Sequence, residues 1–233
     1  EILSCHIAVF HSVFDMLCQW YIAQTGESEE EFPDELAGRL LEMVVSHEVG
    51  HVLGLTHNFY GSSLCETEQL RDAVFLHRHG YGSSIMDYMR MNYAVQPEDG
   101  VDMSDRIPRI GAYDSLAIEW GYRYFPGLAS EEIQEKLSVW IEKKQLERKY
   151  RFQDSGGNLP EAQAEDLGRY SLETAELGMC HLKRLLRDTL RNNGRLSVES
   201  WNLAIRKQYS EYINQAFTYL GGIRKCWGND SVI

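Results

Sequence analysis

Hydrophobic residues recur every three or four positions along several long segments of the chain. The clearest pattern begins at Asp34, just after Pro33, and its apolar face contains Leu36, Leu40, Val44, His47 and His51. This spacing predicts a helix that starts near Pro33, and Gly54 is the residue type that ends a helix. Similar patterns predict further helices at residues 12–23, 113–122, 129–150, 160–192 and 197–220.

Two other segments lack this spacing. Residues 2–10 (ILSCHIAVF) are rich in apolar and β-branched types, which predicts a strand, and residues 58–110 are rich in Gly, Ser, Asn and Asp, which predicts irregular loops. We therefore expect an α+β domain, mostly helical, with a small N-terminal sheet portion. Residues 1–57 would form a partial N-terminal lobe and residues 58–233 a C-terminal lobe. The chain starts inside a strand pattern without an initiating Met, so we expect it to be a piece of a longer protein and to contact the rest of that parent chain.

Composition and charge disfavour several classes of function. The 233 residues have a formal net charge of −12, which disfavours nucleic acid and anionic membranes as main partners. The most apolar run, residues 7–23, is interrupted by His11, Asp15 and Gln19, so no membrane-spanning segment is predicted. The five cysteines are scattered and form no CxxC pair, which argues against a disulfide framework and a thiolate zinc site: Cys5, Cys18, Cys65, Cys180 and Cys226.

The stretch HEVGHVLGLTH, from His47 to His57, carries the strongest chemical signal. His47 and His51 would lie on one helix face, about 6 Å apart along the axis, where two imidazoles can bind one Zn²⁺. Glu48 points about 100° away around the helix, so it is better placed to act as a general base on a water molecule than as a ligand.

The third histidine depends on the glycine. A straight helix would place His57 about 15 Å beyond His47, too far to share a metal ion. Gly54 can adopt the left-handed conformation that ends a helix and reverses the chain, which would return His57 to the metal. Two histidines alone on an apolar face are more often core residues, but five matching positions of HExxHxxGxxH favour a metal site.

This motif resembles the zinc signature of the metzincin metallopeptidases. Downstream, SSIMDY (residues 83–88) resembles the Met-turn of that clan, with Met86 as the methionine beneath the metal. Four further stretches resemble a family of large bacterial zinc-dependent metalloproteases with a Met-zincin domain: VLGLTHNF (52–59), SIMDYMRMNY (84–93), IGAYDSLAIEWGY (110–122) and AQAEDLG (162–168). Residues 1–11 resemble the strand before that family's active-site helix, and residues 195–233 match more loosely.

The resemblance implies a zincin catalytic domain that hydrolyses peptide bonds. His47, His51 and His57 would hold Zn²⁺, Glu48 would take a proton from the attacking water, and Tyr88 would either stabilise the oxyanion or pack the loop. A peptide or protein substrate would lie along an edge strand formed by Ile2, Leu3, Ser4, Cys5, His6 and Ile7. The resemblance also implies a secreted, periplasmic or cell-surface location.

Two other functions use the same motif. An inactive binding module could retain the scaffold, although the zinc ligands and Glu48 are all present, and a zinc hydrolase could act on a non-peptide amide.

Several other residues have less specific signals. His77 and His79 could bind a second metal but are more often solvent-facing in such a loop. Asn58 could hydrogen-bond locally or orient a ligand, and Asp87 could brace a ligand or, as we favour, cap its turn. Cys65 could be an inhibitory thiolate, although no activation motif surrounds it.

Three residues of the IGAYDSLAIEWGY stretch are expected to pack the C-terminal lobe: Tyr113, Asp114 and Trp120.

Overall fold

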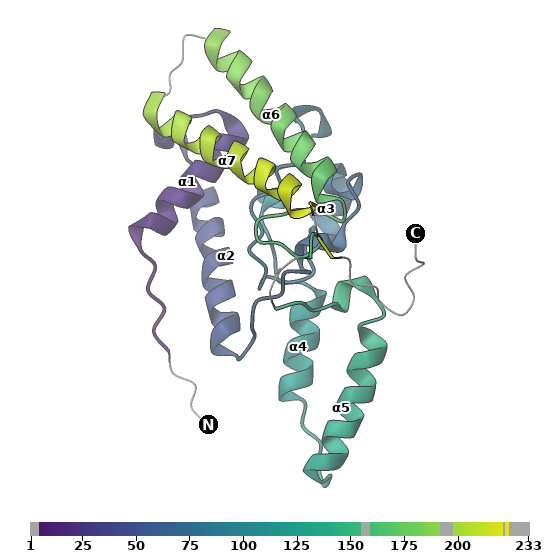
Figure 1. Ribbon diagram of the computed structural model, residues 1–233. Helices are drawn as coiled ribbons and strands as arrows, with labels where there is room; N and C mark the ends of the chain where they lie inside the picture. The colour runs from purple at the N-terminus through teal and green to yellow at the C-terminus, as the bar shows by residue number, and fades with distance from the viewer. Residues whose placement is uncertain (1–4, 155–158, 192–197, 221, 224–233) are drawn as a thin grey trace.

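The computed structural model describes residues 5–154, 159–191, 198–220 and 222–223, and within them the chain is mostly helical (Figure 1). The helices are α1 (His11–Thr25), α2 (Asp34–Val52), α3 (Ala73–His79), α4 (Ala112–Tyr122), α5 (Ser130–Lys144), α6 (Ser171–Arg191) and α7 (Val198–Thr218). Every predicted helix is confirmed in its central part.

The predicted N-terminal strand is wrong where it can be checked. Residues 5–10 have no regular secondary structure and are exposed, and the described part of the chain contains no strand. A lone extended segment cannot form the inter-strand hydrogen bonds that define a sheet, so the apolar composition of ILSCHIAVF is not sufficient. The edge-strand residues Ile2, Leu3 and Ser4 lie outside the described residues. Cys5, His6 and Ile7 lie in the exposed segment.

Two predicted helices are too long. Residues 160–170 form turns, with Glu165 and Gly168 at φ values of 66° and 76°, and the helix begins only at Ser171. Such left-handed conformations interrupt a right-handed helix. The helix predicted to reach residue 150 ends at Lys144 and is followed by a short 3₁₀ turn at Arg148–Tyr150.

Helices α1, α2, α6 and α7 pack around one side of the core, with α7 lying across α1 and beside α6 (Figure 1). Leu17 and Ile22 of α1, Leu40 of α2, Leu182 of α6 and Tyr212 of α7 are buried in it. Burial of these side chains is the main stabilising contribution to helix packing.

The other side of the core is residues 58–110, which we call the loop block. Most of it is irregular, as predicted, but it also contains α3, which was not predicted, and several 3₁₀ turns. Buried side chains replace regular hydrogen bonding here. The hydroxyl of Tyr81 lies within hydrogen-bond distance of the carbonyls of Arg90 and Arg106 and can donate to either, and Asn92 donates to the carbonyl of Leu70. The loop block is therefore a packed part of the core.

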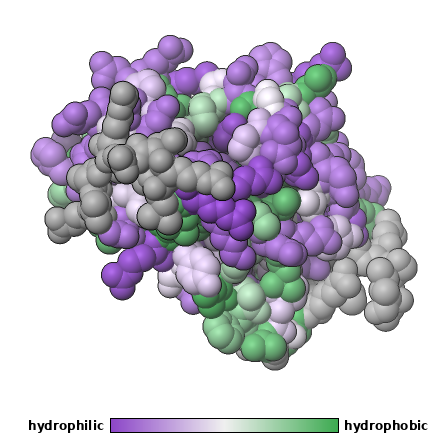
Figure 2. Space-filling view, turned by 90° about the horizontal axis from the view of Figure 1, so that it is seen from above, coloured by the Kyte–Doolittle hydropathy of each residue, from purple (hydrophilic) through white to green (hydrophobic). Residues whose placement is uncertain are grey.

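Helices α4 and α5 project from the body as a pair, which we call the arm (Figure 1). Helix α5 contains no buried residue. Figure 2 shows that the face seen from above is mostly hydrophilic, with hydrophobic residues gathered toward one edge, in keeping with the acidic composition. No helix in the described ranges is long and apolar enough to cross a membrane.

Candidate metal centre and its surroundings

Helix α2 ends in a tight turn that directs the chain back beneath its own last turn. Gly54 has φ +86°, its amide donates to the carbonyl of His51, and the amide of Leu55 donates to the carbonyl of Gly50. This pair of bonds is a Schellman motif, which needs a residue such as glycine in the left-handed region. The predicted reversal at Gly54 is confirmed.

The turn brings the three histidines together. His47, His51 and His57 each offer one ring nitrogen, and these atoms lie within 4.8 Å of one another. The Nε2 atoms of His51 and His57 are 3.2 Å apart. Three nitrogens around one point, each about 2.0–2.1 Å from it, is the ligand arrangement that zinc takes.

Backbone carbonyls orient two of these rings. The Nδ1 atom of His47 lies 2.8 Å from the carbonyl oxygen of Ile85, and that of His51 lies 2.9 Å from the carbonyl oxygen of Leu55. A metal-binding histidine usually donates its other N–H to such a group, which fixes the ring orientation and the tautomer. The Nε2 atom of each ring is then the one directed at the centre.

The condition of His47 fits a bound metal. Its Nε2 atom is buried and has no hydrogen-bond partner in the described structure, although an orphaned buried nitrogen is costly. Burial lowers the pKa of His47, and burial together with the neighbouring histidines lowers the pKa of His57. Both rings are therefore held in the neutral form that binds metal.

The Met-turn supports the histidine-bearing helix from below. Met86 is fully buried, and a Cβ atom added to Gly50 would lie 2.2 Å from its sulfur. The amide of Asn58, next to the third histidine, donates to the carbonyl of Met86. Gly50 is thus needed for close approach of Met86, and the turn and the third ligand are tied together.

Asp114, predicted only to pack the lobe, accepts specific hydrogen bonds beside the candidate metal centre. Its buried carboxylate accepts hydrogen bonds from the hydroxyl of Ser84 at 2.6 Å and from the amides of Ile85 and Gly111 at 2.7 Å. Because the carbonyl of Ile85 orients His47, Asp114 is linked to a candidate ligand through a single residue, Ile85. The sequence signal was an aspartate three residues after Gly111 at a helix start, where carboxylates cap amides.

Tyr88 and Glu48 flank the centre. The Tyr88 ring stacks on His47 with centroids 5.3 Å apart and lies 4.5 Å from the ring of His57, while 47% of the residue is exposed. Burial, and next the carboxylate of Glu48, raise the pKa of Tyr88, which keeps its hydroxyl protonated. Tyr88 therefore lies against the ligands instead of packing deep in the loop.

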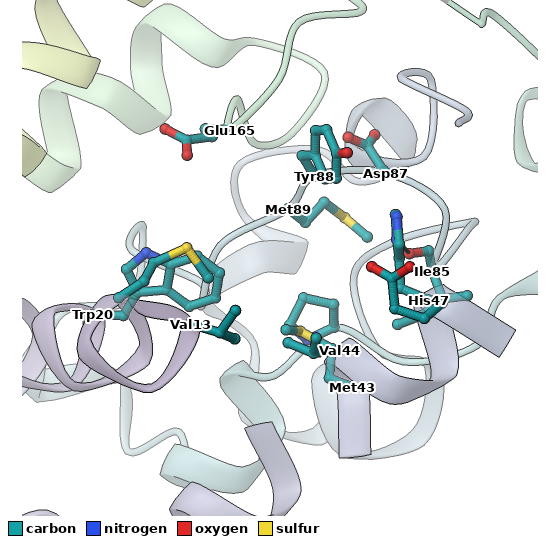
Figure 3. Close-up of a pocket in the computed structure, with 13 residues that line it drawn as sticks. Val13, Trp20, Met43, Val44, His47, Ile85, Asp87, Tyr88, Met89 and Glu165 are labelled. Carbon is teal, nitrogen blue, oxygen red and sulfur yellow. Dashed lines mark hydrogen bonds between the residues drawn. The ribbon is translucent and has the colours of Figure 1, made fainter. Parts of the chain in front are cut away.

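A cavity of about 230 Å³ opens beside the histidines, lined by His47 and Glu48 at one end. Figure 3 shows His47 and Trp20 on opposite sides of this space, with Val13, Val44 and Met89 between them. The geometry thus places one histidine of the candidate metal cluster, a carboxylate and a phenol around one cavity: His47, Glu48 and Tyr88.

The remaining predicted polar candidates have structural contacts. Asn58 is fully buried and donates to the carbonyl of Arg151, so it ties the loop block to a distant segment. Asp87 accepts from the amide of Ser62 at 2.6 Å, so its side chain joins two separate segments of the loop block. His77 is largely exposed beside Asp105, and the searched residues contain no potential metal cluster that includes His77 or His79.

The other candidates divide between core and surface. Cys65 is fully buried, and burial raises its pKa to about 12, so it is a core thiol and not an inhibitory thiolate. Tyr113 stacks on Phe152 with centroids 5.6 Å apart, as expected for packing. Trp120 of α4 is 48% exposed, so the prediction that it packs the lobe is wrong.

A helix carrying two histidines, a glycine turn to a third and a buried methionine turn beneath them define the site as that of a zincin-like metalloprotein. The chain belongs to the Met-zincin family, whose model matches residues 29–231. No curated protein and no solved structure gives a significant match.

Proposed function

We propose that this Met-zincin domain is a zinc-dependent endopeptidase. The observation that carries the proposal is the convergence of His47, His51 and His57, with His47 and the neighbouring Glu48 lining one cavity. Zinc in such a site supplies a Lewis acid that lowers the pKa of water and polarises a carbonyl. Three histidine imidazoles whose ring nitrogens converge are a suitable donor set for it.

Glu48 would act as the general base. It is adjacent to His47 on α2, half-buried, and lines the same cavity, so its carboxylate can take a proton from the attacking water and return it to the leaving amine. The Tyr88 hydroxyl would donate a hydrogen bond to the oxyanion that forms at the scissile carbonyl. His47 and His51 keep fixed orientations through their backbone contacts, so little reorganisation is needed during the reaction.

The test combines metal analysis with digestion of a peptide library. The wild-type protein should bind one zinc ion and cut peptides, and Glu48→Gln should bind zinc but lose about 10²–10⁴-fold in kcat. Glu42→Gln, the same change on an exposed position of the same helix, should keep full activity. Absence of zinc binding would refute the proposal, and zinc binding without cleavage by any form would favour a binding module.

The Tyr88 assignment has its own test. Tyr88→Phe removes only the hydroxyl and keeps the ring stacked on His47. Loss of one oxyanion donor should lower kcat by roughly 10²–10³-fold with zinc content unchanged. Full turnover of the zinc-loaded variant would show that Tyr88 has only a packing role.

A further inference from the structure

The ring of Tyr88 is weakly anchored at the candidate centre. It belongs to a residue that is 47% exposed, and its ring contacts are with His47, His57 and Phe59. Ring stacking is a weak interaction that several arrangements satisfy, so it does not fix one position. The position of the ring therefore depends largely on the backbone of Tyr88.

That backbone is held by residues 162–168, which we call the support segment. The amide of Glu165 donates to the carbonyl of Tyr88 at 2.9 Å. Figure 3 shows Glu165 on the same side of the cavity as Tyr88 and Asp87. In the described part of the chain, Glu165 is the one residue other than glycine with a positive φ, +66°. Such strain persists where surrounding contacts enforce it, and it clusters at functional sites.

Ser62 joins the support segment to the residue before Tyr88. Its amide donates to the carboxylate of Asp87 and its hydroxyl donates to that of Asp166, both at 2.6 Å. Its carbonyl accepts from the amide of Gly168 at 3.0 Å. Ser62, Asp87 and Asp166 are all buried, where hydrogen bonds are stronger than in water. The two carboxylates are therefore fixed to one another through a single serine.

The support segment is also anchored to the helices. The carboxylate of Glu165 pairs with the guanidinium of Arg90, which is 4% exposed. Arg90 in turn donates to Gln208 of α7 at 2.8 Å and lies over the ring of Trp20 of α1. Loss of one partner of a buried ion pair is strongly destabilising, so this anchor is not easily released. The support segment is thus held on one side by the helices and on the other by the Met-turn.

We propose that Asp166 is a positioning residue, which acts through Ser62 and the support segment to hold the Tyr88 ring against the metal centre. The inference rests on the proposed function, because Tyr88 is taken to donate to the oxyanion. A displacement of about 1 Å in a reacting group can cost about 100-fold in rate. A donor on a half-exposed ring therefore needs a fixed backbone.

Two adjacent serines provide a matched pair of variants. Ser62→Ala removes the hydroxyl that holds Asp166, whereas Ser63→Ala removes an equally buried hydroxyl that bonds to the carbonyl of Tyr60 within its own turn. The zinc-loaded proteins are labelled with ¹³C-tyrosine, and the ring signal of Tyr88 is assigned by its absence from Tyr88→Phe. Ser62→Ala should shift this signal toward that of a free tyrosine, because the ring leaves the histidines. Ser63→Ala should leave it unchanged.

Kinetics test whether the support segment acts through Tyr88. Ser62→Ala should lower kcat by at least about 10-fold and change KM by less than about 2-fold, the pattern expected when a transition-state interaction is lost. In the Tyr88→Phe background the same substitution should lower kcat no further, because the group that it displaces is already absent. An equal loss of kcat in both backgrounds would reveal a general structural defect and overturn the inference.

Substitutions of Asp166 test the same bond from its other side. Burial raises the pKa of Asp166 to about 7, so the neutral Asp166→Asn is a small change, and it keeps an acceptor for the hydroxyl of Ser62. Asp166→Asn should retain the Tyr88 signal and kcat, whereas Asp166→Ala should reproduce Ser62→Ala. Circular dichroism and zinc stoichiometry show whether each variant is folded. Asp166→Ala decides the matter if Ser62→Ala does not fold.

The outcomes separate the two proposals. An unchanged Tyr88 signal in folded Ser62→Ala overturns the inference, whether or not the wild type cuts peptides. A shifted signal in Ser62→Ala, with no cleavage by the wild type, supports the positioning role and refutes the peptidase function.

Discussion

The loop block has less regular secondary structure than the arm, but its side chains are more deeply buried. The arm is regular, yet α5 contains no buried residue, whereas the loop block is largely irregular and contains fully buried side chains such as Tyr60, Met86 and Tyr93. The loop block orients His47 through Ile85 and supports α2 through Met86. The positions of the histidines at the candidate site are thus fixed by burial and long-range hydrogen bonds. Helical structure by itself does not fix them.

The largest expected effect on the free energy of unfolding is at Gly111, where the loop block meets the arm. A Cβ atom at Gly111 would lie 2.1 Å from the backbone carbonyl oxygen of Ser83, which cannot move without disturbing the Met-turn. Gly111→Ala should therefore lower the free energy of unfolding by at least about 3 kcal/mol, at the upper end of overpacking effects. Urea denaturation of the purified protein measures this change.

Gly121→Ala is the control, near the other end of α4, whose N-cap is Gly111. An added Cβ atom at Gly121 meets nothing within 4 Å, and alanine is the better helix former, so this variant should be more stable by roughly 0.5–1 kcal/mol. Equal effects of the two substitutions would contradict the distinction between a tightly packed loop block and a loosely packed arm.

A substitution at Asp114 tests whether the loop block affects the zinc affinity of the candidate metal site. Asp114→Asn keeps the size of the side chain but weakens the bonds to Ser84 and Ile85, and so loosens the carbonyl that orients His47. Zinc affinity should fall about 10–100-fold, the usual effect of losing such a supporting group. Competition with a chelator measures it, at a temperature where circular dichroism shows the variant folded. Unchanged zinc affinity in a destabilised variant would reduce Asp114 to a helix cap.

The pH dependence of zinc binding tests the burial of the ligands. Burial lowers the pKa of His47. Burial and the other two histidines lower the pKa of His57. Both rings therefore have a lower pKa than a free histidine, whose pKa is near 6.5. Zinc and protons compete for the same nitrogens, so zinc affinity should persist below pH 6.5 and be lost only as pH falls further. A peptide of residues 45–60, which lacks the loop block, should lose zinc already near pH 6.5. Coincident profiles would show that burial has no influence on the ligands.

The sequence was informative where structure is local. Residues at helical spacing predicted α2, and the short motif with Gly54 predicted that three histidines converge, because both depend on neighbours within about ten residues. The role of Asp114 was missed because its partners Ser84 and Ile85 lie 30 and 29 positions away. The predicted strand is not found in residues 5–10, the part of it that the structure describes, since a strand depends on a partner that composition does not specify.

The smallest expected effect lies on the arm. Glu119 of α4 and Arg123, the residue that follows this helix, form an ion pair at 3.1 Å, and both side chains are 50% exposed. Solvent-exposed pairs of this kind contribute roughly 0.3–0.5 kcal/mol, so Glu119→Gln should change the free energy of unfolding by no more than about 0.5 kcal/mol and leave zinc affinity unchanged. Asp114→Asn, the same kind of change five residues earlier on α4, is the comparison, because only Asp114 faces the loop block. If zinc affinity falls equally in both variants, the orientation of α4 as a whole affects the metal centre. The hydrogen bonds of Asp114 would then not be what orients His47.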